Sequence, residues 1–177
     1  NLELKLQVQV FLFTKEKALA YEVGAKYDFG KGYLTVSAFR TDFKDLQVSA
    51  TNTAGAVDTT NAAKAISQGF EAELAVQPVR GVRLGTSYSY VDAHYRKFTN
   101  APCTIDQLHA KPTACSQDLT GRALPNAPRH SASAYVDVNT PLSERINLLA
   151  SANIGWKSAY YTEITDTPQQ KADSLAI

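Results

Sequence analysis

The chain has 177 residues and a formal net charge of +1, with 20% charged and 44% hydrophobic residues. This length suits one domain of ordinary size, and the near-neutral charge argues against a nucleic-acid binder, which would carry a basic excess. No run of about 18 apolar residues is present and no charged-then-apolar leader opens the chain, so we expect neither a transmembrane helix nor a signal peptide. Strands of a membrane barrel would escape this hydropathy test, because only every second side chain faces lipid.

The first segment, residues 1–13, alternates apolar and polar side chains. A period of two predicts a strand with one apolar face. The segment alone does not decide between a barrel strand and the edge strand of a soluble sandwich. Residues 14–19 are polar, and we expect a short connection with some helical propensity there.

A first hairpin is predicted around a glycine-containing turn. Residues 21–29 alternate, residues 30–32 (Gly-Lys-Gly) supply glycine for positive φ, and a second strand follows from residue 33 to residue 48. Residues 51–63 are polar, small and turn-rich, so we expect a loop.

The register of this hairpin follows from the length of its loop. A three-residue loop pairs Phe29 with Tyr33, and it places Glu22 opposite Arg40 as an ion pair on the inner face. The same register is expected to turn the aromatic side chains outward: Tyr27, Phe29, Tyr33, Phe39 and Phe43.

The second hairpin has the clearest pattern. Residues 69–77 alternate without interruption, residues 78–81 (Pro-Val-Arg-Gly) predict a turn, and alternation resumes in residues 83–98. Pairing Val76 with Leu84 keeps the apolar side chains on one face, since a slip of one residue would exchange the faces. The predicted pairs are Phe70 with Tyr90, Ala72 with Tyr88, Glu71 with Ser89, and Glu73 with Ser87.

Residues 99–127 form the longest irregular stretch, and loops of this length are usually functional or disordered. Cys103 and Cys115 stand twelve positions apart within it. That spacing does not suit zinc, and the histidines (His94, His109, His130) are too scattered to complete a site. We expect a disulfide worth about 3 kcal/mol, which implies an oxidising compartment such as the periplasm or cell surface. Two free thiols are the alternative.

A third hairpin is predicted from residues 129–139 and 146–163, around a turn at residues 140–144. Pairing Val138 with Ile146 aligns their apolar side chains on one face. The remaining segments are a polar loop at residues 164–173 and the beginning of a further strand at residues 174–177.

Short turns and long loops are expected to alternate strictly along the chain. This layout is typical of an outer-membrane barrel, with tight periplasmic turns and long extracellular loops. Aromatic residues gather near both predicted strand ends, as they do at membrane interfaces. The turns lie near Gly30, Pro78 and Pro141, and the loops begin near Thr51, Thr99 and Ile164.

Residues 19–161 resemble the late barrel of TonB-dependent outer-membrane receptors. The resemblance rests on a series of segments: YEVGAKYDF, LTVSAFRTDFKDLQV, NAAKAISQGFEAELAVQPVRGVRLGTSYSYVDAHY and DLTGRALPNAPRHSASAYV. It implies an all-β, antiparallel, up-and-down transmembrane β-barrel, which in this family has about 22 strands around an N-terminal plug. Residues 1–177 are then expected to be a fragment of the barrel domain, a partial barrel of about seven to eight strands, with the plug domain, the TonB box and the terminal aromatic residue absent.

The resemblance also implies a function in the bacterial cell outer membrane. Receptors of this family take up a scarce ligand, such as a ferric siderophore, haem, cobalamin or an oligosaccharide. The implied partners are outer-membrane lipid, the remainder of the barrel and plug, the small-molecule ligand, and the TonB–ExbB–ExbD system acting through the plug. One alternative is a complete small eight-stranded barrel, either an outer-membrane protein or a lipocalin-like binder. A soluble β-sandwich binding module is another.

The sequence gives little support to an enzyme. Asp92 and His94 share one strand face near Ser87 and Ser89, but hydrophilic residues at the rim of a barrel explain them better than a catalytic triad. No phosphate-binding loop, nucleophile elbow or metal motif is present, so no cofactor is expected. The evenly spaced carboxylates are expected to line the lumen: Glu22, Glu71 and Glu73.

Ligand contacts are expected on the long loops and the rim, because binding residues concentrate on loops that a rigid scaffold holds. Four polar or aromatic residues near the predicted loop ends are the candidates, against the alternative that they are ordinary solvated loop residues. They are Tyr95, Arg96, Arg122 and His130.

Overall fold

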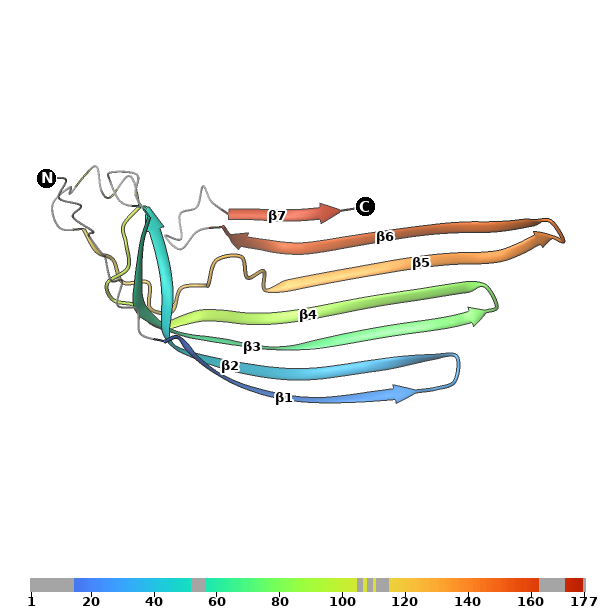
Figure 1. Ribbon diagram of the computed structural model, residues 1–177, viewed down its shortest axis with the longest axis horizontal. Coiled ribbons are helices and arrows are strands. Elements are labelled where there is room, and N and C mark those ends of the chain that lie inside the picture. Colours follow the sequence, from blue (N-terminus) through green and yellow to red (C-terminus); the bar gives the residue numbers. More distant parts are fainter. Residues whose placement is uncertain are drawn as a thin grey trace, which may run out of the picture.

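The computed structural model describes residues 15–51, 57–104, 107, 110, 115–162 and 171–176. Within these residues the chain forms one antiparallel sheet whose strands follow the order of the sequence (Figure 1). The strands are β1 (Lys17–Asp28), β2 (Gly32–Thr51), β3 (Val57–Val79), β4 (Val82–Lys97), β5 (His130–Ser143), β6 (Ile146–Tyr161) and β7 (Lys171–Ala176). The predicted strand at residues 1–13 lies outside the described residues.

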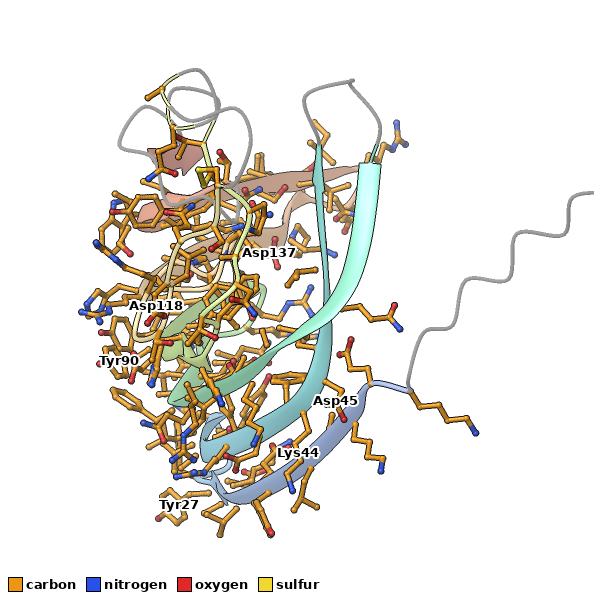
Figure 2. All side chains as sticks on the ribbon, turned by 90° about the vertical axis from the view of Figure 1, so that its left-hand side faces the viewer. Tyr27, Lys44, Asp45, Tyr90, Asp118 and Asp137 are labelled. Carbon is orange, nitrogen blue, oxygen red and sulfur yellow. A yellow bond between two sulfur atoms is a disulfide. The ribbon has the colours of Figure 1, made fainter. Side chains whose placement is uncertain are left out.

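This up-and-down sheet is a partial barrel, so the predicted fold class is confirmed. Figure 1 shows the tight turns of β1–β2, β3–β4 and β5–β6 at one end of the sheet. The sheet is curved, and Figure 2 shows Tyr27 and Tyr90 on its convex side and Asp137 on its concave side. In the described part of the chain, no helix is long and apolar enough to cross a membrane.

The convex face is apolar and uncovered. Several of its large side chains are between 38% and 47% exposed. A contiguous patch of this kind marks a surface that another apolar medium covers. Examples are Leu34, Val36, Phe70, Leu84, Ile154 and Trp156.

The predicted register of the second hairpin is confirmed. Val76 pairs with Leu84, Phe70 with Tyr90, and Ser89 lies opposite the carboxylate residue Glu71. The uninterrupted alternation of β3 leaves one register that puts all apolar side chains on one face, which is why the sequence alone was sufficient here.

The predicted register of the first hairpin is wrong by one residue. The Asp28 side chain accepts the N–H of Gly30 at 2.8 Å, and the Phe29 N–H donates to the Gly32 carbonyl at 3.0 Å. These bonds close a connection of two residues, Gly30 and Lys31, rather than three, so that Asp28 pairs with Tyr33.

One residue is enough to exchange the faces of a strand. Tyr33, Phe39 and Phe43 therefore point to the inner face of β2, contrary to the prediction. The expected ion pair of Glu22 with Arg40 is also wrong, because Tyr21 lies opposite Arg40 and Glu22 lies opposite Phe39.

The third hairpin shifts by an even number of residues and keeps its faces. Val138 pairs with Ala150 instead of Ile146, and β5 continues through Pro141 to Ser143, which pairs with Ile146. The strand pairing shifts register between Pro141 and Ser143. This shift accommodates the proline, which cannot donate a ladder hydrogen bond.

Three segments that were predicted to be connections contain strand residues in the structure. Residues 46–51 pair with residues 57–63, so most of the loop expected at residues 51–63 is a continuation of β2 and β3, favoured by the threonines and Val57 of that segment. The strict alternation of short turns and long loops fails at this position. The connection expected at residues 14–19 contains the start of β1, and β7 begins at Lys171 rather than Ser174.

The buried residues gather at the long-loop end of the sheet. β2 and β3 bend there (Figure 1), next to Asp45, which has a φ of 56° beside an interruption of the pairing. The cluster joins these strands to β4 and to the segment that follows it. Its members are Val48, Ala63, Ala65, Tyr95, Phe98, Ala101 and Leu119.

Candidate functional site

The inner face carries two rows of polar side chains that cross five neighbouring strands. Strand pairing aligns residues at equal height, and every second residue points to the same face. The row nearer the long loops is Ser37, Glu71, Ser89, Ser131 and Lys157. The row nearer the short turns is Thr35, Glu73, Ser87, Ser133 and Gly155. We call these the inner polar rows.

Hydrogen bonds link the inner polar rows across strands. The hydroxyl oxygens of Ser87 and Ser133 lie 2.7 Å apart, and the Tyr33 hydroxyl donates to Glu73 Oε1 at 2.7 Å. The first bond links β4 with β5 and the second links β2 with β3, and the Ser89 hydroxyl donates to Glu71 Oε1 at 3.4 Å between β3 and β4. The inner wall is therefore an ordered hydrogen-bonding surface.

A groove of about 500 Å³ lies over the inner polar rows. Its polar lining consists of hydroxyls, two carboxylates and one ammonium group. Such groups can bind a polar segment or solute by hydrogen bonds and ion pairs. The inward-facing residues that line it are Thr35, Ser37, Glu71, Glu73, Ser87, Ser89, Ser131, Ser133 and Lys157.

Residues 99–127, which we call the cysteine loop, are anchored to the long-loop end of β4. Cys103 and Cys115 form a disulfide with a Cα–Cα distance of 5.9 Å, which confirms the predicted bond. Beside it, Ala101 and Gln117 exchange backbone hydrogen bonds of 2.9 and 3.0 Å. The disulfide and this bridge close the base of the loop.

The cysteine loop also pairs with β4 through its backbone. The N–H of Leu124 donates to the carbonyl of Ala93 at 2.9 Å, and the N–H of Gly121 donates to the carbonyl of Tyr95 at 2.7 Å. These bonds occupy the edge of β4 above its last pair with β5, Tyr90 with His130. The loop thus replaces a neighbouring strand.

Tyr95 supports this loop from below. Its side chain is 1% exposed, and its ring packs on Phe98 with a centroid distance of 4.9 Å. Burial disfavours the charged phenolate and raises the pKa of Tyr95 to about 12. On the loop itself, hydrogen bonds from the Thr120 hydroxyl and backbone N–H hold the pKa of Asp118 below its ordinary value.

The residues predicted as ligand contacts do not form one cluster. Tyr95 is covered by the loop. Arg122 belongs to the segment of the cysteine loop that pairs with β4, and its carbonyl accepts the Tyr95 N–H at 2.9 Å. Arg96 and His130 belong to the outer face.

The two outer-face candidates contact other residues of that face. Arg96 Nη1 lies 3.6 Å from Asp42 Oδ1. The ring Nδ1 of His130 lies 2.7 Å from the Tyr88 hydroxyl.

The residues considered as a catalytic triad lie on opposite faces. His94 Nδ1 is 3.4 Å from Asp92 Oδ1 on the outer face, whereas Ser87 and Ser89 belong to the inner polar rows. The described residues contain no group of three or more histidine, cysteine or acidic side chains that could hold a metal ion.

Sequence reasoning placed the inner carboxylates Glu71 and Glu73 on the lumen side but missed Tyr33. A signal was available, because Asp two residues before a turn glycine favours a tight turn closed by its own side chain. With the shorter turn, Tyr33 falls on the inner face and reaches Glu73.

Residues 10–175 match the family described as TonB dependent receptor-like, beta-barrel. The chain belongs to the TonB-dependent receptor β-barrel family. This family consists of transporters and receptors and is not an enzyme family.

Two solved receptors share the fold of this TonB-dependent receptor barrel. The ferric yersiniabactin uptake receptor FyuA from Yersinia pestis is 19% identical with a TM-score of 0.65, over 90% of this chain and 21% of that chain. The siderophore receptor PiuA from Acinetobacter baumannii is 20% identical with a TM-score of 0.63, over 89% of this chain and 21% of that chain. The chain thus spans about a fifth of the length of either receptor. No curated protein sequence matches it.

Proposed function

We propose that this chain is a segment of the β-barrel domain of a receptor in the bacterial outer membrane. The carrying observation is the division of its faces: apolar side chains cover the convex face, and the inner polar rows line the concave face. Residues 82–90 of β4 carry mostly apolar or aromatic side chains on the outer face, and their number agrees with the about 9 to 11 residues that a tilted strand needs to cross a bilayer.

The two edges of the sheet support a segment over a complete eight-stranded barrel. In the described residues, β1 pairs only with β2 and β7 only with β6. Unpaired backbone groups at an edge cost several kcal/mol each within a bilayer, so further strands must satisfy them. We propose that the rest of the receptor supplies these strands and the plug.

The proposed activity is uptake of a scarce ligand, driven by the TonB–ExbB–ExbD system acting through the plug. A ferric siderophore is the first candidate, because one similar receptor is named for the uptake of ferric yersiniabactin and the other is named a siderophore receptor. Haem, cobalamin and oligosaccharides are the other classes that the family membership supports.

The test is uptake of iron in cells that carry the full-length receptor. Cells with the intact gene should accumulate radioactive iron from a mixture of ferric siderophores, and deletion of the gene or of tonB should abolish this uptake. If the deletion strain takes up as much iron as the intact strain from every siderophore tested, siderophore transport by this receptor is excluded. The same strains supplied with haem, cobalamin or oligosaccharides would then identify the ligand class.

A further inference from the structure

β4 extends beyond its pairing with β5 at the long-loop end of the sheet. The last pair is Tyr90 with His130, and β4 continues to Lys97. The backbone groups of this extension that point away from β3 need other partners, because β5 no longer accompanies them. Unpaired groups at a strand edge are costly where water is excluded, and they invite pairing with other chains.

Residues 118–129, which we call the strap, occupy this edge. The Val91 N–H donates to the Arg129 carbonyl at 2.9 Å, directly beyond the last pair of β4 with β5. The next bond joins the Leu124 N–H to the Ala93 carbonyl at 2.9 Å. Between these bonds β4 advances by two residues and the strap by five, so the strap has three more residues than a regular strand would need.

The additional residues of the strap reach across to β6. The Asn126 N–H donates to the Tyr161 carbonyl at 2.7 Å, and the φ of 55° at Asn126 turns the chain toward that strand. Pro125 and Pro128 flank this turn, and neither has an N–H that would need a partner. The strap is thus bonded to β4 on one side and to β6 on the other (Figure 1).

A tight turn at the beginning of the strap is held by local hydrogen bonds. The Thr120 N–H donates to Asp118 Oδ1 at 2.9 Å, and the Arg122 N–H donates to the Leu119 carbonyl at 3.0 Å. Gly121 supplies the positive φ of 82° that this turn requires. Because these bonds join near neighbours in the sequence, the turn does not need the disulfide to form.

Burial fastens the turn to the end of β4. The Leu119 side chain is 3% exposed and packs in one cluster with Phe98 and Ala101, which are both 0% exposed. The Leu119 N–H donates to the Phe98 carbonyl at 2.9 Å, and the Phe98 N–H donates to the Thr120 hydroxyl at 3.0 Å. Apolar burial of this kind is the main source of stability in a folded segment.

We propose that the strap closes the barrel wall between β4 and β6 and that it stays closed without the disulfide. Its bonds to both strands, its local turn and the burial of Leu119 do not involve the bond between Cys103 and Cys115. The disulfide then acts only on the ring that it closes, residues 104–114. Reduction changes this ring and leaves the wall intact, so the base of the cysteine loop is a fixed part of the barrel and not a lid.

Hydrogen exchange of the purified full-length receptor, measured by mass spectrometry, tests the proposal. Replacing both cysteines (Cys103→Ala with Cys115→Ala) should change the exchange of the strap by less than about threefold. Leu119→Ala should raise it at least about tenfold, because it leaves a cavity in the cluster that fastens the turn. The reporting amides form the bonds between β4 and the strap, and they are Val91, Tyr95, Gly121 and Leu124.

The matched control is Leu142→Ala, a leucine that is 65% exposed at the short-turn end of β5 and should leave the exchange unchanged. Heat-dependent gel mobility verifies that each barrel folds. If Leu119→Ala does not fold, Thr120→Val serves, because it removes the hydroxyl that accepts the Phe98 N–H and should speed exchange of that amide.

Two results would overturn the proposal. One is exchange in the cysteine-free receptor that is as fast as in Leu119→Ala, or in Thr120→Val where that variant replaces it. The other is equal exchange in the strap variant and in Leu142→Ala. The measurement needs no ligand, so its outcome is separate from the test of uptake.

Discussion

At the residue scale, Tyr95 illustrates how position decides the role of a side chain. Its place near a loop end suggested a ligand contact, yet the cysteine loop covers it and its ring packs on Phe98. A tyrosine that is buried in this way supports the packing of the loop above it. Its hydroxyl must stay protonated, because a phenolate in an apolar surrounding loses its hydration.

The raised pKa of Tyr95 predicts a pH dependence of the cysteine loop. The pKa in the folded state is about 12, above the ordinary value of 10.0. Burial of the neutral phenol therefore stabilises the loop fully below pH 10.0, and this contribution is lost as the pH rises toward 12. Ultraviolet titration of the full-length receptor should show less tyrosinate at pH 11 than if every tyrosine had the ordinary pKa, and cleavage of the loop by a protease active in alkali should increase above pH 10.

Tyr95→Phe is the control for this titration. The phenylalanine variant keeps the packing on Phe98 and has no ionisable hydroxyl, so its loop should resist alkaline cleavage better than that of the unaltered protein. Identical cleavage profiles for the two proteins would show that ionisation of Tyr95 does not govern the loop.

At the scale of the strands, close packing between β3 and β4 depends on Gly69. A Cβ atom added there would overlap the Tyr90 carbonyl oxygen and would lie 3.1 Å from the Phe39 ring. The first contact is with backbone, which cannot move aside without disturbing the strand pairing. The second glycine of interest, Gly155 on β6, has no atom within 4 Å of the corresponding position.

Gly69→Ala should therefore impair folding of the barrel, whereas Gly155→Ala should be tolerated. We expect a cost of about 1 to 3 kcal/mol for Gly69→Ala, in the range of overpacking a filled site. The measurement is the urea midpoint of folding into lipid vesicles, with the full-length receptor. Equal midpoints for the two variants would mean that β3 and β4 approach each other less closely than the geometry indicates.

The strands also show what could be predicted from sequence. The register of β3 with β4 was predictable, because eight alternating residues admit one face assignment. The predicted register of the first hairpin was wrong because of a single turn residue. Asp28 shortens the turn and thereby moves Tyr33, Phe39 and Phe43 to the inner face. Local patterns determine which residues alternate, but the turn determines which face they meet.

The candidate site was predictable to the same extent. The inward carboxylates Glu71 and Glu73 follow from alternation within one hairpin. The full inner polar rows require the pairing of β4 with β5, which a long loop separates in sequence. Pairing across such a distance leaves no local signal in the residues, and so the groove was not anticipated.

At the scale of the whole molecule, the division into an apolar convex face and a polar concave face is the property that makes the chain a barrel wall. A soluble sandwich would bury its apolar faces against each other, whereas here Leu34, Phe70 and Trp156 remain uncovered. Lipid is the medium that can cover such a face, so neighbouring residues on one strand should differ sharply in their tolerance of charge.

Leu74→Arg and Glu73→Ala test this difference at adjacent positions of β3. Leu74 lies in the outer row between Leu34 and Thr86, and Glu73 lies in the inner polar rows. Arginine on the lipid face near the middle of the bilayer should cost about 2 to 4 kcal/mol, because its charge loses hydration in the hydrocarbon. Glu73→Ala removes the acceptor of the 2.7 Å bond from Tyr33 at a surface that water can reach, and it should cost much less than Leu74→Arg. Equilibrium folding of the full-length receptor into vesicles measures both. Equal costs, or a larger cost for Glu73→Ala, would mean that the convex face does not meet lipid.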